Sequence, residues 1–344
     1  MKHLLYLSLI STIACGKKPG SYEIQSAAES SASDDLRKQA DEQWNNRADK
    51  DQLKAAMASY EQLFAQDPTN KEVAARLVRG WYFYGDAYET DIEAKKSSWD
   101  KAITFGKKCL ELNEEYAAIL AKEGKREDAA KALQADDVPC TYWTASSLGK
   151  WAKASGLATT LKHIGAAEAY ISRVEELEPN YFYGAVNRYW GALYAGKPSF
   201  AGQDLERSQR EFLKSMEISP DYLGTRILYA DYWATKNQDQ VAVFDEMIQY
   251  VMASDVNALD PELIPENLAE IEKAKALWEA RSDKFLDAPE PEALKEQPPV
   301  APPAQEEAPV EAEEAPDEEV ATPEGSEETA PAGEETATPE DSTS

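Results

Sequence analysis

One spacing of residue types recurs along this chain, and it restricts the fold more than any other feature. In each copy a small residue is followed, four and seven positions later, by two further residues on the same helical face. A proline stands at the twelfth position after the small residue. Proline then ends the helix, because it lacks the amide donor and clashes with the preceding turn. The three copies are Ala56, Tyr60, Leu63 and Pro68; Ala167, Ile171, Val174 and Pro179; and Ser208, Phe212, Ser215 and Pro220.

The spacing resembles the second helix of a tetratricopeptide repeat, in which a small residue lets the paired helix approach closely. A weaker copy without the proline is Ala102, Gly106, Cys109 and Glu114. Pro179 and Pro220 stand 41 residues apart, whereas the standard repeat has about 34 residues. The repeats are therefore irregular, and the extra residues fall in the glycine- and proline-containing stretch 194–205.

No stretch alternates apolar and polar residues for long enough to predict a strand. We therefore expect an all-α fold, an irregular tetratricopeptide-like superhelix of helical hairpins (an α-solenoid) over residues 35–286. About ten to twelve helices should stack, with a concave side as the natural binding surface. Beside the helix that Pro68 ends, we expect helices over 71–88, 99–112, 125–134, 141–157, 181–195, 221–235, 240–253 and 266–284.

The last segment, residues 287–344, differs sharply in composition from the rest. It has 19 acidic residues, one lysine, 11 prolines and no aromatic residue, within a chain of formal charge −28. Such a segment cannot bury enough apolar surface to fold, so we expect a disordered acidic tail that acts as a solvated spacer. The overall acidity also argues against a nucleic-acid partner, since phosphate binding needs clustered Lys and Arg.

The first residues have the features of an export signal. Lys2 precedes an apolar run from Leu4 to Ile13, which is too short to span a bilayer. Ala14 and Cys15 resemble a bacterial lipoprotein cleavage box, which predicts a signal peptide over 1–14, lipidation of Cys15 and a flexible tether over 15–34. An ordinary signal cut elsewhere is the alternative. By analogy with lipoproteins, Gly16 after the cysteine indicates the periplasmic face of the outer membrane.

Two further cysteines, Cys109 and Cys140, remain in the predicted helical region. In an exported protein an even pair can form a disulfide. Free cysteine is also among the most buried residue types, so we favour two small core residues and keep the disulfide as the alternative. The spacing alone does not decide between these alternatives, because a disulfide needs a short distance between the two Cα atoms.

Groups that carry out catalysis are nearly absent from the sequence. His163 is the one histidine outside the signal, and no cysteine or serine pattern surrounds it. Neither a phosphate-binding glycine loop nor a metal-binding spacing of Cys and His occurs. We therefore expect no enzyme activity, no cofactor and no metal.

The most informative stretches for binding are rich in aromatic residues, at 80–88, 139–152 and 181–196. Most of these rings are expected to fill the core of the stack. Tyr and Trp can also border an apolar cavity or channel, because they combine a flat apolar face with a polar tip. Asn187 and Arg188 could meet a carboxylate there. The candidate lining residues are Trp81, Tyr84, Tyr142, Trp143, Trp151, Asn187, Arg188, Trp190 and Tyr194.

An export signal, irregular repeats and two particular sequence stretches occur together in this chain. In this combination the chain resembles one family, the T-component of TRAP transporters. The stretches are "YWTASSLGKWA" at 142–152 and "YGAVNRYWGALYAGKPSFAGQDLERSQREFLKSMEISPDY" at 183–222. The resemblance covers about residues 35–285 and excludes the acidic tail. It implies a periplasmic lipid-anchored protein that binds the solute-binding protein of a TRAP transporter. It also implies that the protein can form a homotrimer, with an apolar channel in each subunit.

Our hypothesis from the sequence is therefore a non-enzymatic scaffold that docks a periplasmic solute-binding protein and passes on an apolar or organic-acid ligand. The alternative is a repeat lipoprotein that assists the assembly of outer-membrane barrels or pili. That alternative needs the same anchor and concave surface, but it needs no apolar cavity.

Overall fold

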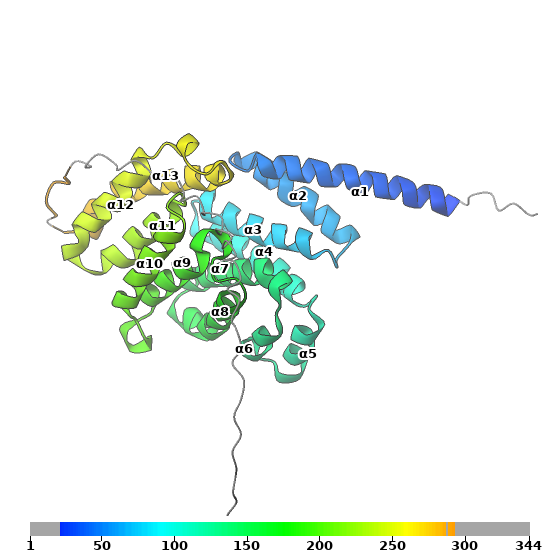
Figure 1. The fold of residues 1–344 in the computed structure, drawn as a ribbon, viewed down its shortest axis with the longest axis horizontal. Helices are drawn as coiled ribbons and strands as arrows, with labels where there is room; N and C mark the ends of the chain where they lie inside the picture. Colours follow the sequence, from blue (N-terminus) through cyan, green and yellow to red (C-terminus); the bar gives the residue numbers. More distant parts are fainter. Residues whose placement is uncertain (1–20, 287, 293–344) are drawn as a thin grey trace, which may run out of the picture. The chain divides into compact units, whose positions relative to one another are not determined.

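The computed structural model describes the backbone of residues 21–286 and 288–292, and side chains from Ser33 onward. The expected signal peptide, Cys15 and all of the expected tail except residues 288–292 lie outside the described residues. Within the described residues the fold is all-helical, without a strand, and the helices pack as consecutive hairpin pairs (Figure 1). The α-solenoid fold class is thus confirmed.

Fourteen α-helices are present in the described chain, and eleven of them have ten or more residues. This number agrees with the expected ten to twelve. Their bounds are α1 Ser21–Asn45, α2 Lys50–Gln66, α3 Lys71–Ala87, α4 Ile92–Leu110, α5 Glu114–Glu123, α6 Arg126–Ala129, α7 Val138–Ala154, α8 Leu157–Leu177, α9 Tyr181–Gly196, α10 Leu205–Ile218, α11 Gly224–Leu228, α12 Val241–Ala253, α13 Ile264–Glu279 and α14 Arg281–Lys284.

Several boundaries differ from the sequence expectations. Helix α1 begins at Ser21, inside the expected tether, and contains neither proline nor glycine to interrupt it. Helix α4 begins at Ile92 rather than near residue 99, because the Asp91 carboxylate caps it by accepting bonds from the Glu93 and Ala94 amides.

The expected helix over 125–134 is wrong as one continuous element, whereas the expected helix over 221–235 forms without a break but changes its type. Over 125–134 only the one-turn α6 forms, followed by 3₁₀ turns. The helix does not continue because the Asp137 carboxylate accepts a hydrogen bond from the backbone N–H of Gln134. This bond caps a new 3₁₀ turn over Ala135–Asp137. Over 221–235 the five-residue α11 passes directly into a π-helical turn, Tyr229–Trp233.

The recurring small residues lie where helices touch, as the repeat pattern predicts. On α10, the Ser208 hydroxyl donates to the Gly191 carbonyl of α9 at 2.7 Å, and the Ser215 hydroxyl donates to the Gly184 carbonyl at 3.0 Å. These side chains are short enough to let the two backbones approach, and their hydroxyls find partners in the facing helix. The large residue of the same copy, Phe212, is fully buried.

A methyl group added at Gly191 should therefore be costly. An ideal Cβ at this position would lie 2.8 Å from the Phe212 ring, so Gly191→Ala must displace that ring. We expect the free energy of unfolding to fall by about 1–3 kcal/mol, measured by chemical denaturation. Gly196→Ala on the same helix is the matched control, because its nearest contact would be an ordinary 3.8 Å to Tyr232. Equal stability of the two variants would contradict the close approach.

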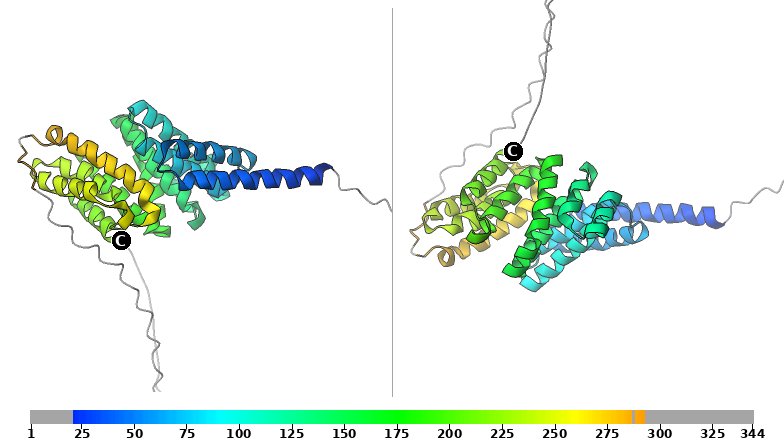
Figure 2. Two further views of the ribbon diagram at one scale, coloured as in Figure 1. Left: turned by 90° about the horizontal axis from the view of Figure 1, so that it is seen from above. Right: turned by 90° about the horizontal axis from the view of Figure 1, so that it is seen from below.

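The apolar side chains form two large cores. The first is built from α1–α4 and α7–α9 with the short elements between them, and the second from α10–α14. Helix α13, late in the chain, contacts α3 of the first core. Figure 2 shows α1 and α2 lying side by side at the N-terminal end. The two cores meet chiefly where α9 packs against α10, and also where α9 contacts α11 and α3 contacts α13. The site lies along this junction.

A disulfide joins Cys109 of α4 to Cys140 of α7 across a Cα–Cα distance of 6.2 Å. The sequence analysis favoured two unpaired core cysteines, and the structure shows that preference to be wrong. The bond ties two helices that also pack tightly at Gly106, where an added Cβ would lie 2.0 Å from the Thr144 hydroxyl.

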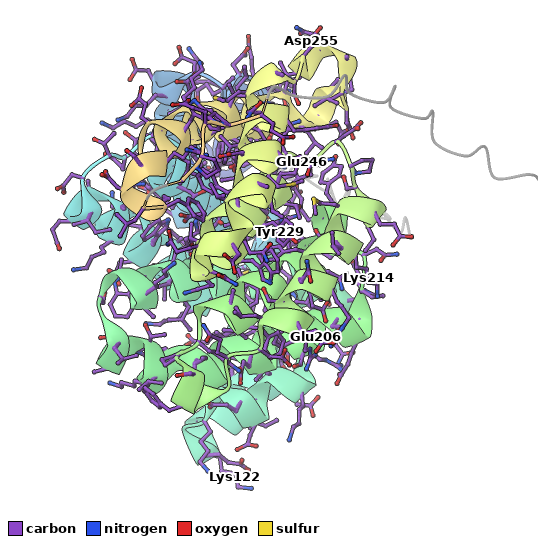
Figure 3. All side chains as sticks on the ribbon, turned by 90° about the vertical axis from the view of Figure 1, so that its left-hand side faces the viewer. Lys122, Glu206, Lys214, Tyr229, Glu246 and Asp255 are labelled. Atoms are coloured by element: carbon purple, nitrogen blue, oxygen red, sulfur yellow. A yellow bond between two sulfur atoms is a disulfide. The ribbon has the colours of Figure 1, made fainter. Side chains whose placement is uncertain are left out.

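The outer faces of the second half are charged. Figure 3 labels Glu206 and Lys214 on α10 and Glu246 on α12, and all three are exposed. The inward side of the same helices carries the core residues Phe212 and Phe244, both fully buried. Polar residues thus cover the outer faces of α10 and α12. The charged side chains of the internal cavity differ from them because they lie inside the protein.

Candidate ligand-binding cavity

A cavity of about 510 Å³ lies at the junction of the two cores. Helices α3, α7, α8, α9, α11 and α13 all contribute to its wall. A volume in this range suits a small organic molecule. Much of the wall is apolar, including Leu148, Ile164, Leu193, Ile227 and Leu277.

The charge of the wall is opposite to that of the chain. Eight Lys and Arg side chains line the cavity, against four Asp and Glu side chains, although the whole chain carries −28. The positive residues are Arg79, Lys95, Lys150, Lys153, Arg188, Lys197, Lys273 and Lys284. The wall of this acidic protein therefore carries more positive than negative side chains, although Arg79, Lys150, Lys197, Lys273 and Lys284 are each paired with a carboxylate.

Asp86, at the end of α3, is the centre of one buried charge cluster. Its carboxylate accepts from Lys150 of α7 at 2.6 Å and from Lys273 of α13 at 2.5 Å. Lys273 also donates to Glu270 at 2.8 Å. Burial alone would raise the pKa of Asp86, but the two lysines outweigh it and hold this pKa below its usual value. The cluster fastens three helices to one another.

Glu266 of α13 is the centre of a second cluster. Its carboxylate accepts from Arg47 at 2.8 Å and from Arg79 of α3 at 2.7 Å. Burial opposes ionisation of Glu266, but Arg79 and Arg47 more than offset it, so the pKa of this acid is lowered. Arg79 also lies in the wall of a second hollow of about 1210 Å³, which is bordered by the end of α1, Phe182 and Tyr183. The two hollows thus adjoin at Arg79.

A left-handed turn opens helix α9. Phe182, Tyr183 and Gly184 have φ values of 42°, 57° and 69°, a region that residues with a side chain rarely adopt. Arg188, one turn later on α9, stabilises this backbone. Its guanidinium donates to the Tyr183 carbonyl at 2.9 Å and to the Phe182 carbonyl at 3.3 Å. The strained turn therefore places Arg188 in the cavity wall and two aromatic rings beside the second hollow.

Comparison with protein families identifies the kind of protein in which this cavity lies. The sequence model of the TRAP transporter T-component matches residues 49–285, which is more than half of the chain. The chain belongs to the TRAP transporter T-component family. A comparison with curated protein sequences gives no match.

The matched region of this T-component family member contains all of the cavity-lining residues. The family is an accessory part of transporters rather than an enzyme family. None of the helices in the described residues has the length and hydrophobicity to cross a membrane.

Of the lining residues proposed from the sequence, Tyr142, Trp143 and Arg188 lie in the cavity wall. The others lie outside it. Trp81, Tyr84, Asn187 and Trp190 are buried between helices, whereas Trp151 and Tyr194 are half-buried. Three of these side chains donate hydrogen bonds to carboxylates of the protein itself. The Trp81 indole donates to Glu61, the Asn187 amide to Glu211, and the Trp190 indole to Glu175.

The sequence analysis missed the charged residues of the wall, above all Asp86, Lys150, Glu266 and Lys273. A usable signal existed for two of them. Asp86 interrupts the aromatic stretch 80–88, and Lys150 is the one charge in the apolar stretch 139–152. Because an unpaired buried charge is costly, each of these positions requires a partner from elsewhere in the fold.

Proposed function

We propose that this protein is a periplasmic, lipid-anchored accessory subunit of a TRAP transporter. It docks the solute-binding protein of the transporter and offers its internal cavity to the transported ligand. The observation that carries the proposal is the ligand-sized cavity with a positive wall, inside a chain of the T-component family. The anchor is supported by the sequence around Cys15, and the periplasmic location by the family.

In this proposal the two hollows are the ends of one route for the ligand, and the ion-paired Arg79 closes that route between them. Aromatic rings flank the closure, since the Arg79 guanidinium lies 4.6 Å from the centroid of the Phe182 ring and 5.6 Å from that of Trp143. A ligand that passes must displace this cation from between the rings.

The docking is tested with the immobilised full chain and a purified TRAP solute-binding protein from the same organism. We expect saturable binding by biolayer interferometry. A solute-binding protein of an ATP-driven importer from the same organism is the control, and it should not bind. Absence of binding to the TRAP protein, or equal binding to both, would overturn the proposal. Capture of a barrel-assembly subunit instead would favour the assembly alternative.

The anchor is tested separately by labelling cells with a palmitate analogue. Label should appear on the wild-type chain and disappear in Cys15→Ser, which should also move the protein from the membrane to the soluble periplasmic fraction. Cys109→Ser and Cys140→Ser serve as controls and should keep the label. An unlabelled wild-type chain would exclude lipidation of Cys15.

A further inference from the structure

The closure between the two hollows includes a strained piece of backbone. Phe182 and Tyr183 have φ values of 42° and 57°, and the left-handed region is unfavourable for residues with a side chain. Strain of this kind persists only where surrounding contacts enforce it, and it occurs preferentially at sites where a conformational change is part of the function. The contacts that hold this turn therefore indicate what the turn does.

One side chain enforces the strained conformation. The Arg188 guanidinium donates to the Tyr183 carbonyl at 2.9 Å and to the Phe182 carbonyl at 3.3 Å. The plane of the guanidinium is itself fixed, because it lies 4.0 Å from the centroid of the Tyr222 ring. Without these donors, the two strained residues would lose the contact that holds their carbonyls in place.

The strained residues lie between two fixed points of the backbone. After them, the Gly184 carbonyl accepts from the Ser215 hydroxyl of α10 at 3.0 Å, and a Cβ added at Gly184 would lie 3.1 Å from the Ser215 carbonyl oxygen. Before them, the Tyr181 amide donates to the Glu178 carbonyl at 3.0 Å. A change in the φ values of residues 182 and 183 therefore moves two aromatic rings while α9 stays packed on α10.

One of these rings, that of Phe182, covers the cation at which the two hollows adjoin. The Arg79 guanidinium lies 4.6 Å from the Phe182 centroid, and the same ring lies 4.9 Å from that of Trp143. Arg79 also forms a buried ion pair with Glu266, which is costly to break. Relaxation of the turn, in contrast, releases backbone strain, which offsets part of the cost of losing two hydrogen bonds. The turn is therefore the part of the closure that opens most readily.

We propose that Phe182 and Tyr183 form a gate over Arg79, and that Arg188 is the positioning residue that keeps this gate closed. When Arg188 releases the two carbonyls, the φ values return to the negative region and the Phe182 ring leaves Arg79. The cation is then uncovered on one side and can move out of the route. The inference rests on the proposed function in that it names how the route between the two hollows opens.

The gate is tested by the chemical accessibility of Arg79 in the full-length chain. Phenylglyoxal modifies accessible guanidinium groups, and peptide mass spectrometry gives the rate of modification for each arginine. Arg188→Met keeps the aliphatic stem and removes the donors, so Arg79 should be modified about fivefold faster than in wild type, because the gate opens more often. An unchanged rate at Arg79 would overturn the role of Arg188.

Arg47 is the control within the same molecule. It shares Glu266 with Arg79 and also lines the second hollow, but its described ring contact is Trp44 rather than Phe182. Its rate of modification should stay close to the wild-type value in Arg188→Met. Equal acceleration at both arginines would show a general loosening of the structure, and it would overturn the gate.

The role of the strain is tested with Arg188 left in place. Tyr183→Gly and Tyr183→Ala both remove the ring and its hydroxyl, but only glycine adopts the left-handed region readily. The closed gate is therefore more populated in the glycine variant, and Arg79 should be modified about threefold more slowly than in the alanine variant. Equal rates, or the reverse order, would overturn the strained turn as the moving part.

The covering ring is tested with Phe182→Ala, which also leaves Arg188 in place. Arg79 should be modified about as fast as in Arg188→Met, because either change uncovers the same guanidinium. A rate at the wild-type value would show that the Phe182 ring does not cover Arg79 in solution, and it would overturn the gate even if Arg188→Met failed to fold.

The two proposals can fail independently, because the modification experiments need no partner protein. A chain that captures the TRAP solute-binding protein but shows no acceleration at Arg79 would retain the proposed function and lose the gate. A chain in which Arg188→Met accelerates modification at Arg79 alone, but which captures no solute-binding protein, would retain the gate and lose the proposed partner.

Discussion

Replacing Asp86 by alanine should lower the free energy of unfolding by about 3–5 kcal/mol, measured by urea denaturation. The Asp86 carboxylate is 12% exposed and is the partner of both Lys150 and Lys273. Its removal leaves Lys150 without a carboxylate and Lys273 with Glu270 alone. The loss arises because a charged group stays buried after its partner is gone.

A double variant tests this cause. Asp86→Leu combined with Lys150→Met removes one charge of each sign and keeps the pair between Lys273 and Glu270. Apolar replacement of a buried ion pair is often neutral or stabilising, so we expect most of the lost stability to return. If the double variant were as unstable as Asp86→Ala, the unpaired lysine would not be the cause.

Glu266→Ala should have an effect of similar size, about 3–5 kcal/mol. Glu266 binds Arg47, which follows α1, and Arg79 of α3, so it fastens the start of the helical region to α13. The matched control is Glu272→Ala on the same helix, where the acid is 72% exposed in its pair with Lys275. Exposed pairs contribute about 0–1 kcal/mol, so the control should remain close to wild type in urea denaturation.

The lowered pKa of Glu266 also gives a pH dependence with a definite sign. The folded state binds the proton less readily than the unfolded state, in which a Glu titrates near about 4.3. The stabilisation is therefore fully present above that pH and is lost as the pH falls through the folded pKa. Glu266→Gln should show a shallower loss of melting temperature below about pH 4 than wild type. Parallel curves would contradict the assignment.

The fold was largely predictable because it depends on local patterns. The copies ending at Pro68, Pro179 and Pro220 mark α2, α8 and α10, and each ends just before its proline. The predictions of helices were wrong or incomplete where contacts between distant residues determine the local backbone. Nothing in the periodicity of residues 221–235 distinguishes a π-helical turn from an α-helix, because both place apolar residues on one face.

The cavity was less predictable, because its charged residues come from distant parts of the chain. Asp86 is 64 residues from Lys150 and 187 residues from Lys273, and no spacing rule joins such positions. The aromatic density identified the right helices, and Tyr142, Trp143 and Arg188 do line the wall. Aromatic residues such as Trp190 fill cores as readily as cavities, so density alone could not separate the two roles.

The contrast between a positive wall and a chain of charge −28 has a kinetic consequence. At physiological ionic strength fields are screened over about 8 Å. In the proposed periplasmic setting, an anion from solution therefore meets the acidic exterior before it senses the wall. Free diffusion into the cavity should be slow for such a ligand. Direct handover from a protein docked over the opening avoids this barrier, because the ligand then never crosses the repulsive solvent layer.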